Sequence, residues 1–144
     1  MTDDGLARFA EALASDPPGP AGGSAAAAAV AMAAALAELA ARRSGLTDEE
    51  ARAAAARSLA VSLAAADATA YAEVLREEGD ARRAALDRAS GVLREIASLA
   101  TEVSALAAGL AESAKPVVRA DAAAAVELAS AARHACERLA QANE

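Results

Sequence analysis

The sequence predicts an all-α protein, an antiparallel bundle of about five helices. The first observation is composition, because 51 of the 144 residues are alanine, the strongest helix former and a weak strand former. The second is patterning: apolar residues recur at helical spacing, and no run alternates with a period of two. The third is that the breaks between these segments are short. Short connections place sequential helices side by side, which gives an antiparallel bundle.

The first two helices are expected at residues 3–15 and 24–43. The first has one apolar face and stops at residues 16–20, where three prolines prevent its continuation. The second is nearly all alanine in its first half, and Gly45 lies just past its end as a stop signal. Alanine faces of this kind allow two helix backbones to approach closely.

The remaining helices are expected at residues 47–78, 81–112 and 121–141. The third opens on Thr47 and Glu50, which have the spacing of a capping box. The fourth carries a heptad pattern, whose core positions are Leu86, Leu93, Ala100 and Ala107 and then Ala89, Ile96, Val103 and Leu110. Further apolar residues widen this stripe, so we expect the fourth helix to face more than one neighbour.

We expect residues 1–144 to form a single domain, because one core serves a chain of this length. The chain has no Trp, one Tyr and one Phe, so a single bundle would bury limited apolar area per residue. Burial of a second face against another copy would offset this deficit. We therefore predict a homodimer.

Charge and cysteine content argue against several classes of function. The net charge of −7 disfavours a nucleic-acid binder. One histidine and one cysteine supply neither an internal disulfide nor the ligands of a zinc cage. The longest uncharged apolar stretch, residues 25–37, is shorter than the roughly 20 residues of a membrane span. No secretory signal is recognisable, so we expect a cytoplasmic protein that binds neither membrane nor metal.

A glycine loop precedes the second helix. Residues 18–24 read Pro-Gly-Pro-Ala-Gly-Gly-Ser, which places Gly22, Gly23 and Ser24 directly before the helix. Free backbone N–H groups there can hold an anion, and the missing Cβ atoms let a ligand touch the backbone. Serine is also a common N-cap. On spacing alone, a plain helix start is the simpler interpretation.

Two aspartates are candidates for chemistry. Asp67 lies one turn before Tyr71 on an apolar stripe, where desolvation raises the pKa of a carboxyl group and suits it to proton transfer. A structural hydrogen bond to a neighbouring helix is the alternative. Asp121 opens the predicted last helix, where an N-cap is the simpler interpretation.

In these features the chain resembles the cyclodeaminase/cyclohydrolase family, all-helical folate enzymes that include the cyclodeaminase part of formiminotransferase-cyclodeaminase and bacterial methenyltetrahydrofolate cyclohydrolases. The family's glycine motif, close to Pro-x-Pro-Gly-Gly-Gly-Ser-Ala-Ala-Ala, is matched by residues 18–27, with Ala21 replacing one glycine. Its Asp-x-x-x-Tyr is matched by Asp67 and Tyr71, and its aspartate before the last helix by Asp121.

The chain departs from the family pattern at several positions. Residues 42–45 read Arg-Arg-Ser-Gly where many members have Thr-x-Gly-Lys. The proline expected in the fourth helix is Leu93, and one asparagine expected near the C-terminus is Leu139, while another falls on Asn143. The chain is also shorter than most members.

The resemblance implies an enzyme that acts on a reduced folate without a metal or redox cofactor. In the cyclodeaminase reaction, N10 of 5-formiminotetrahydrofolate attacks the formimino carbon, ammonia leaves and 5,10-methenyltetrahydrofolate forms. In the cyclohydrolase reaction, water opens the methenyl ring to the 10-formyl compound. Asp67 or Asp121 is the implied acid/base. The implied ligand contacts are Gly22, Gly23, Ser24 and Tyr71, with Arg42, Arg43 and Arg119 for the glutamate carboxylates.

A competing hypothesis is a family relative without catalysis, which acts as a dimeric helical scaffold or partner-binding module. The missing lysine and the short chain favour it. The sequence leaves open which folate is used, in which direction the reaction runs and whether a neighbouring enzyme passes the substrate across.

Overall fold

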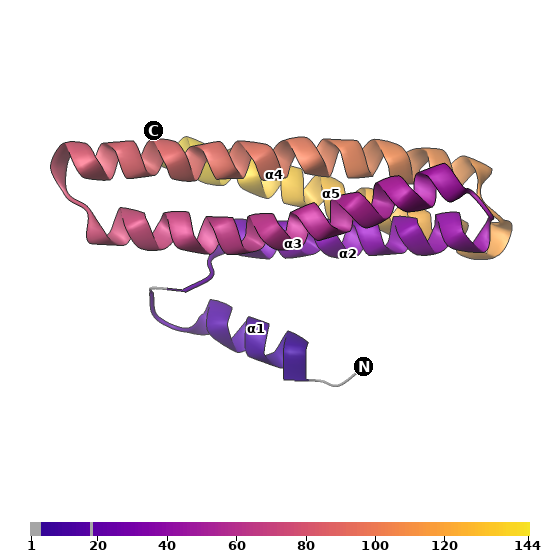
Figure 1. Cartoon of the computed structure of the whole chain (residues 1–144), viewed down its shortest axis with the longest axis horizontal. Coiled ribbons are helices and arrows are strands. Elements are labelled where there is room, and N and C mark those ends of the chain that lie inside the picture. The colour runs from indigo at the N-terminus through magenta and orange to yellow at the C-terminus, as the bar shows by residue number, and fades with distance from the viewer. Residues whose placement is uncertain (1–3, 18) are drawn as a thin grey trace.

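The computed structural model describes residues 4–17 and 19–144, and this part of the chain contains five α-helices and no strand (Figure 1). The helices are α1 (Asp4–Ala14), α2 (Gly22–Arg43), α3 (Thr47–Arg76), α4 (Gly79–Ser113) and α5 (Pro116–Ala142). Helices α2 to α5 form an antiparallel bundle, and α1 stands apart from it. The predicted all-α class is thus confirmed, with four of the five helices in the bundle. Asp3, the predicted start of the first helix, and Pro18 of the glycine loop lie outside the described residues.

Three helices begin earlier than their sequences predict, and the smallest change is in α4, which begins at Gly79 rather than at residue 81. Helix α2 begins at Gly22 rather than Ser24, with Ala21 as its N-cap, so both glycines belong to its first turn. Helix α5 begins at Pro116, because the fixed φ and missing N–H of proline suit the first turn of a helix. Asp121 therefore lies inside α5 and is not its N-cap, which corrects the expected start of the last helix.

Helix α2 runs through the core and contacts α3, α4 and α5. Seven of its eleven buried residues are alanines, namely Ala26, Ala27, Ala33, Ala34, Ala37, Ala40 and Ala41. Because alanine projects only a methyl group, the neighbouring helices pack close to the α2 backbone. The larger core side chains come mainly from α4, whose predicted heptad positions are buried except for the half-buried Leu86. Helix α4 contacts α2, α3 and α5, which confirms that its wide stripe faces several neighbours.

Helices α2 and α3 are each long and apolar enough to cross a membrane by length and composition alone. In α2, 56% of the most apolar window is buried inside the bundle, as expected of a core helix. The share in α3 is 28%, and Leu59 and Val61 of α3 are exposed. These two side chains are two residues apart and point to different sides of α3, and the homodimer remains a prediction.

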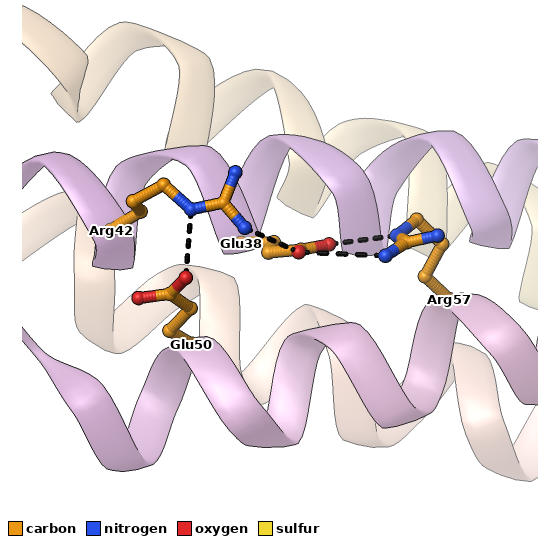
Figure 2. Close-up of polar contacts among 4 residues, drawn as sticks. All are labelled: Glu38, Arg42, Glu50 and Arg57. Carbon is orange, nitrogen blue, oxygen red and sulfur yellow. Dashed lines mark hydrogen bonds and ion pairs between the residues drawn. The ribbon is translucent and has the colours of Figure 1, made fainter.

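A buried glutamate joins α2 to α3 near the end of α2 (Figure 2). Glu38 accepts hydrogen bonds from Arg57 Nε at 2.7 Å and from Arg42 Nη2 at 2.8 Å. Arg42 also pairs with Glu50 through its Nε atom at 2.7 Å. The carboxylate of Glu50 thus binds Arg42 instead of a backbone N–H group at the start of α3. Because no side chain caps this helix start, the predicted capping box is wrong.

Candidate functional site

The antiparallel order brings four helix ends together at one end of the bundle: the starts of α2 and α4 and the ends of α3 and α5. A cavity of about 410 Å³ opens among them. Its wall contains the predicted site residues Gly22, Gly23, Asp67 and Tyr71. Most of the remaining wall is apolar, with Val74, Leu75, Leu86, Ala89, Leu93, Leu139 and Ala142. A polar group placed here thus faces a largely apolar chamber.

Asp67 is the buried carboxyl group of this cavity, with 6% of its surface exposed. It projects from α3 toward the start of α2, where Ser24 Oγ lies 3.0 Å from Asp67 Oδ2. The same Ser24 Oγ lies 3.1 Å from the backbone oxygen of Ala64. A hydroxyl has a single proton to donate, so Ser24 donates either to Asp67 or to Ala64. When Ser24 donates to Ala64, its oxygen is free to accept a hydrogen bond from the protonated form of Asp67.

The environment of Asp67 shifts its protonation equilibrium. Burial raises the pKa of this carboxyl group, because desolvation disfavours the charged form. Hydrogen bonds from the side chain and backbone of Ser24 oppose that rise. Burial is the larger effect, so Asp67 holds its proton to a higher pH than an exposed aspartate does. A carboxyl group of this kind can act as a general acid and, after it loses the proton, as a general base.

The position of the Asp67 carboxylate requires a glycine at residue 23. A Cβ atom at position 23 would overlap the carboxylate of Asp67. The carboxylate thus lies directly against the first turn of α2, where free N–H groups and the helix dipole favour negative charge. Gly22 differs, because a Cβ there would meet only the flexible end of Leu139, at 3.0 Å. Of the predicted loop contacts, Gly23 and Ser24 are buried and serve the carboxyl group, and Gly22 lies exposed at the cavity wall.

The structure does not bring the other predicted site residues to this cavity. Arg42 and Arg43 end α2, some 20 residues or about 30 Å along the helix from Gly22. Arg119 and Asp121 lie near the start of α5, at the same far end. These four residues lie at the opposite end of the bundle from Asp67, unlike the expected arrangement.

Two of these arginines have structural partners. The guanidinium of Arg42 bridges Glu38 and Glu50 (Figure 2). Arg119 donates from Nε to the backbone oxygen of Ala114 at 2.8 Å, which satisfies a carbonyl just beyond the end of α4. Their positive charge therefore supports helix junctions.

Two further polar residues line the cavity, and the sequence indicated neither as a site residue, although Asn143 matches an asparagine of the family pattern. Arg82 lies in the first turn of α4 and donates from Nη1 to the backbone oxygen of Val74 at 2.7 Å. Asn143 follows the end of α5 and donates from Nδ2 to Ser90 Oγ at 3.1 Å. The start of α4 and the end of α5 reach the Asp67 cavity through the antiparallel order of the helices, which no local sequence signal gives.

The fold and the cavity define an all-helical bundle protein with a buried carboxyl group beside a glycine-rich helix start. A sequence profile of the formiminotransferase-cyclodeaminase family matches residues 5–143, and the chain belongs to this family.

Among solved structures, formiminotetrahydrofolate cyclodeaminase from Thermotoga maritima is similar, with a TM-score of 0.90 and 22% sequence identity over 96% of this chain and 77% of that chain. At this identity the likeness establishes a shared fold. No match is found among curated protein sequences.

Proposed function

We propose that the protein is a folate one-carbon enzyme, either a formiminotetrahydrofolate cyclodeaminase or a methenyltetrahydrofolate cyclohydrolase. The observation that carries the proposal is the buried carboxyl group of Asp67 in the wall of an open cavity. Family membership narrows the chemistry to that of a folate cyclodeaminase-like protein. The apolar wall formed by residues such as Leu86, Leu93 and Leu139 suits the flat ring system of a reduced folate.

In the cyclodeaminase reaction, Asp67 would move the protons. N10 of the substrate forms a bond to the formimino carbon, and that carbon then releases its nitrogen as ammonia. N10 loses a proton and the departing nitrogen gains protons. A carboxyl group that alternates between its two forms beside the reacting carbon can accept the first proton and deliver one to the leaving group. Ser24 can follow this alternation by donating to Asp67 or to Ala64.

In the cyclohydrolase reaction, the ionised form of Asp67 would act as the base. Water adds to the methenyl carbon, and the carboxylate takes up a proton from that water. The hydroxyl group on that carbon then loses its own proton to solvent as the carbonyl forms. The carbon–nitrogen bond to N5 breaks in the same step, and Asp67 delivers to N5 the proton that it took up. Both reactions pass through a carbon centre of cationic character, which a nearby carboxylate stabilises electrostatically. The cavity supports either reaction, and assays with both substrates distinguish them.

The second candidate function is an inactive relative that serves as a scaffold. The exposed apolar side chains of α3, Leu59 and Val61, together with Ser44-Gly45 in place of the family's Gly-Lys ending, favour it. A scaffold has no need for a carboxyl group buried at a cavity. Homodimerisation is part of both functions, and a cytoplasmic location remains a prediction.

The test is turnover of 5-formiminotetrahydrofolate and of the methenyl compound by wild type, Asp67→Asn and the matched control Asp121→Asn. Loss of a general acid/base costs roughly 10²–10⁴-fold in turnover, and we expect this loss for Asp67→Asn alone. Loss in Asp121→Asn instead would move the acid/base to the far end of the bundle. A wild type that neither binds nor converts a reduced folate would leave the scaffold as the function.

A further inference from the structure

Leu139 of α5 lies directly over the first turn of α2, where the end of one helix meets the start of the other (Figure 1). A Cβ atom on Gly22 would be 3.0 Å from Leu139 Cδ1 and 3.2 Å from Leu139 Cδ2. The two methyl groups of Leu139 therefore occupy the space that a side chain at position 22 would use. Leu139 is half-buried and belongs to the wall of the Asp67 cavity, so part of its surface is open to a ligand there.

Asp67 has the same relationship to the next residue of α2. Its carboxylate fills the space of a Cβ atom on Gly23, and consecutive Cα atoms are about 3.8 Å apart. The methyl groups of Leu139 and the carboxyl group of Asp67 thus cover adjacent residues of one helical turn. Burial is the main cause of the raised pKa of the Cys136 thiol, one turn earlier on α5, and negative charge on Asp67 adds to it. This part of α5 therefore lies close to the carboxyl group.

The position of the acid restricts where a reacting group can lie. An acid/base must come within about 2.6–3.2 Å of the atom whose proton it moves, directly or through one water molecule. The reacting carbon of the ligand is bonded to that atom, so it lies in the part of the cavity that Asp67 and Leu139 border. Leu139 has no side-chain donor or acceptor, so it acts on the ligand there through its size.

The other leucines of the cavity wall lie elsewhere. Leu86 and Leu93 belong to α4, whereas the atoms nearest to a Cβ at either glycine of α2 belong to Leu139 or Asp67. Leu139 also departs from the family pattern, which has an asparagine at this position. An asparagine could hydrogen-bond a ligand through its amide. The leucine of this chain can only limit the ligand's size.

We propose that Leu139 is a specificity-determining residue, whose methyl groups restrict the reacting carbon of the ligand to a hydrogen substituent. The cavity then accepts a one-carbon unit, such as the formimino or methenyl group, and rejects the homologue in which a methyl group replaces that hydrogen. This ligand class rests on the proposed function. An apolar pocket discriminates against one extra carbon by roughly 10–200-fold in kcat/KM.

The experiment measures kcat/KM for 5-formiminotetrahydrofolate and for 5-acetiminotetrahydrofolate, which carries the additional methyl group. The proteins are wild type, Leu139→Ala and the milder variant Leu139→Val. Leu128→Ala is the matched control, because Leu128 is a half-buried leucine of the same helix that packs against the core outside the cavity wall. The ratio of the two kcat/KM values within one sample does not depend on the folded fraction, so a loss of stability cannot imitate a change in specificity.

We expect Leu139→Ala to lower the preference for the formimino over the acetimino compound by about 10-fold or more, and Leu139→Val to lower it by less. Leu128→Ala should keep the wild-type preference. The methenyl compound and its methyl-bearing homologue apply the same comparison to the cyclohydrolase reaction. An unchanged preference in both Leu139 variants would overturn the role of Leu139 and leave the proposed function standing.

Binding of two unreactive ligands separates failure of this role from failure of the proposed function. 5-Formyltetrahydrofolate and 5-acetyltetrahydrofolate differ by the same methyl group, and neither can release ammonia. Suppose that wild type converts none of the reactive compounds, but binds the formyl ligand more tightly than the acetyl ligand, and that Leu139→Ala narrows the difference. The proposed function is then overturned and the role of Leu139 is supported. Equal affinities in wild type, or binding of neither ligand, would overturn the role of Leu139.

Discussion

Gly23 and Asp67 are in such close contact that the carboxylate of Asp67 fills the space a side chain at position 23 would need. The contact joins the first turn of α2 to the last third of α3. It also places the carboxyl group where backbone N–H groups and the hydroxyl of Ser24 surround it. The glycine is thus part of the packing that positions the acid, in addition to lining the cavity.

Gly23→Ala should displace the carboxyl group of Asp67. Overpacking of a tight contact typically costs about 1–3 kcal/mol of unfolding free energy, and turnover should fall as far as in Asp67→Asn. Gly22→Ala is the matched control, because its Cβ would meet only the flexible end of Leu139. Urea unfolding and turnover assays of both variants test this prediction.

The double variant Gly23→Ala/Asp67→Ala provides a sharper version of this test. Without the carboxylate, the added methyl group has room, so the double variant should be more stable than the sum of the single effects predicts. Coupling energies of contacting residues are typically about 0.5–3 kcal/mol. Strict additivity of the two substitutions would show that the two groups are not in contact.

The raised pKa of Asp67 predicts a stability that falls as pH rises. Above the ordinary aspartate pKa of about 3.9, the unfolded state loses its proton first, while the folded state retains its own until the higher folded pKa. The folded state then binds more protons than the unfolded state, so the stability due to this group is present below the ordinary pKa. It is lost as pH rises through the folded pKa.

Unfolding free energies of wild type and Asp67→Asn, measured across that pH range, test this sign. The variant has no titrating group at position 67, so its advantage over wild type should grow as pH rises. Ser24→Ala removes a hydrogen bond that favours the carboxylate and should move the fall in stability to higher pH. A constant difference between wild type and Asp67→Asn at all pH values would contradict the raised pKa.

Glu38 should show the opposite pH dependence. The hydrogen bond from Arg57 is the main cause that lowers the pKa of Glu38, with added attraction from Arg57 and Arg42. The stability from this lowered pKa is present above the ordinary glutamate pKa of about 4.3 and is lost as pH falls through the folded pKa. Glu38→Gln should therefore lower Tm at pH 7 and lose less stability than wild type on acidification. Glu95→Gln, at an exposed position of α4, should leave both Tm and the acid response unchanged.

Cys136 should be inert to thiol reagents in the folded protein. Burial raises the pKa of its thiol to about 11, with a further contribution from the negative charge of Asp67, and the side chain is 1% exposed. Only the thiolate reacts at an appreciable rate. Labelling at pH 8 should thus proceed no faster than unfolding and should become rapid in urea. Fast, complete labelling without denaturant would show that the α5 end of the bundle opens.

The sequence predicts a helix correctly where its local pattern and its position in the core agree. The heptads of α4 give its buried face, because helical period and core position coincide. The starts of α2 and α5 were placed too late, because Ser24 and Asp121 are favoured N-cap types. In the folded chain the helices begin at Gly22 and Pro116 instead.

Part of the site was also predictable, because Asp67 and Tyr71 lie one turn apart on a single helix. The structure places the predicted arginines, Arg42, Arg43 and Arg119, at the other end of the bundle from Asp67. Arg42 lies near the end of the same helix that Gly22 begins, so the length of α2, about 30 Å, separates them. Arg82 lines the Asp67 cavity only because the start of α4 lies beside the ends of α3 and α5, a tertiary relationship without a local sequence signal.

The alanines that line the buried face of α2 also restrict how this core can change. Most globular cores lose stability through substitutions that remove atoms and leave a void. At the buried alanines of α2, every replacement except glycine adds atoms, and the adjoining backbones leave little space to receive them. Alanine also has no side-chain torsion to fix on folding, so the native state is defined by how the four backbones lie against one another. Substitutions in such a core can thus only add atoms or introduce glycine. We expect most tolerated substitutions on the outward faces of the helices.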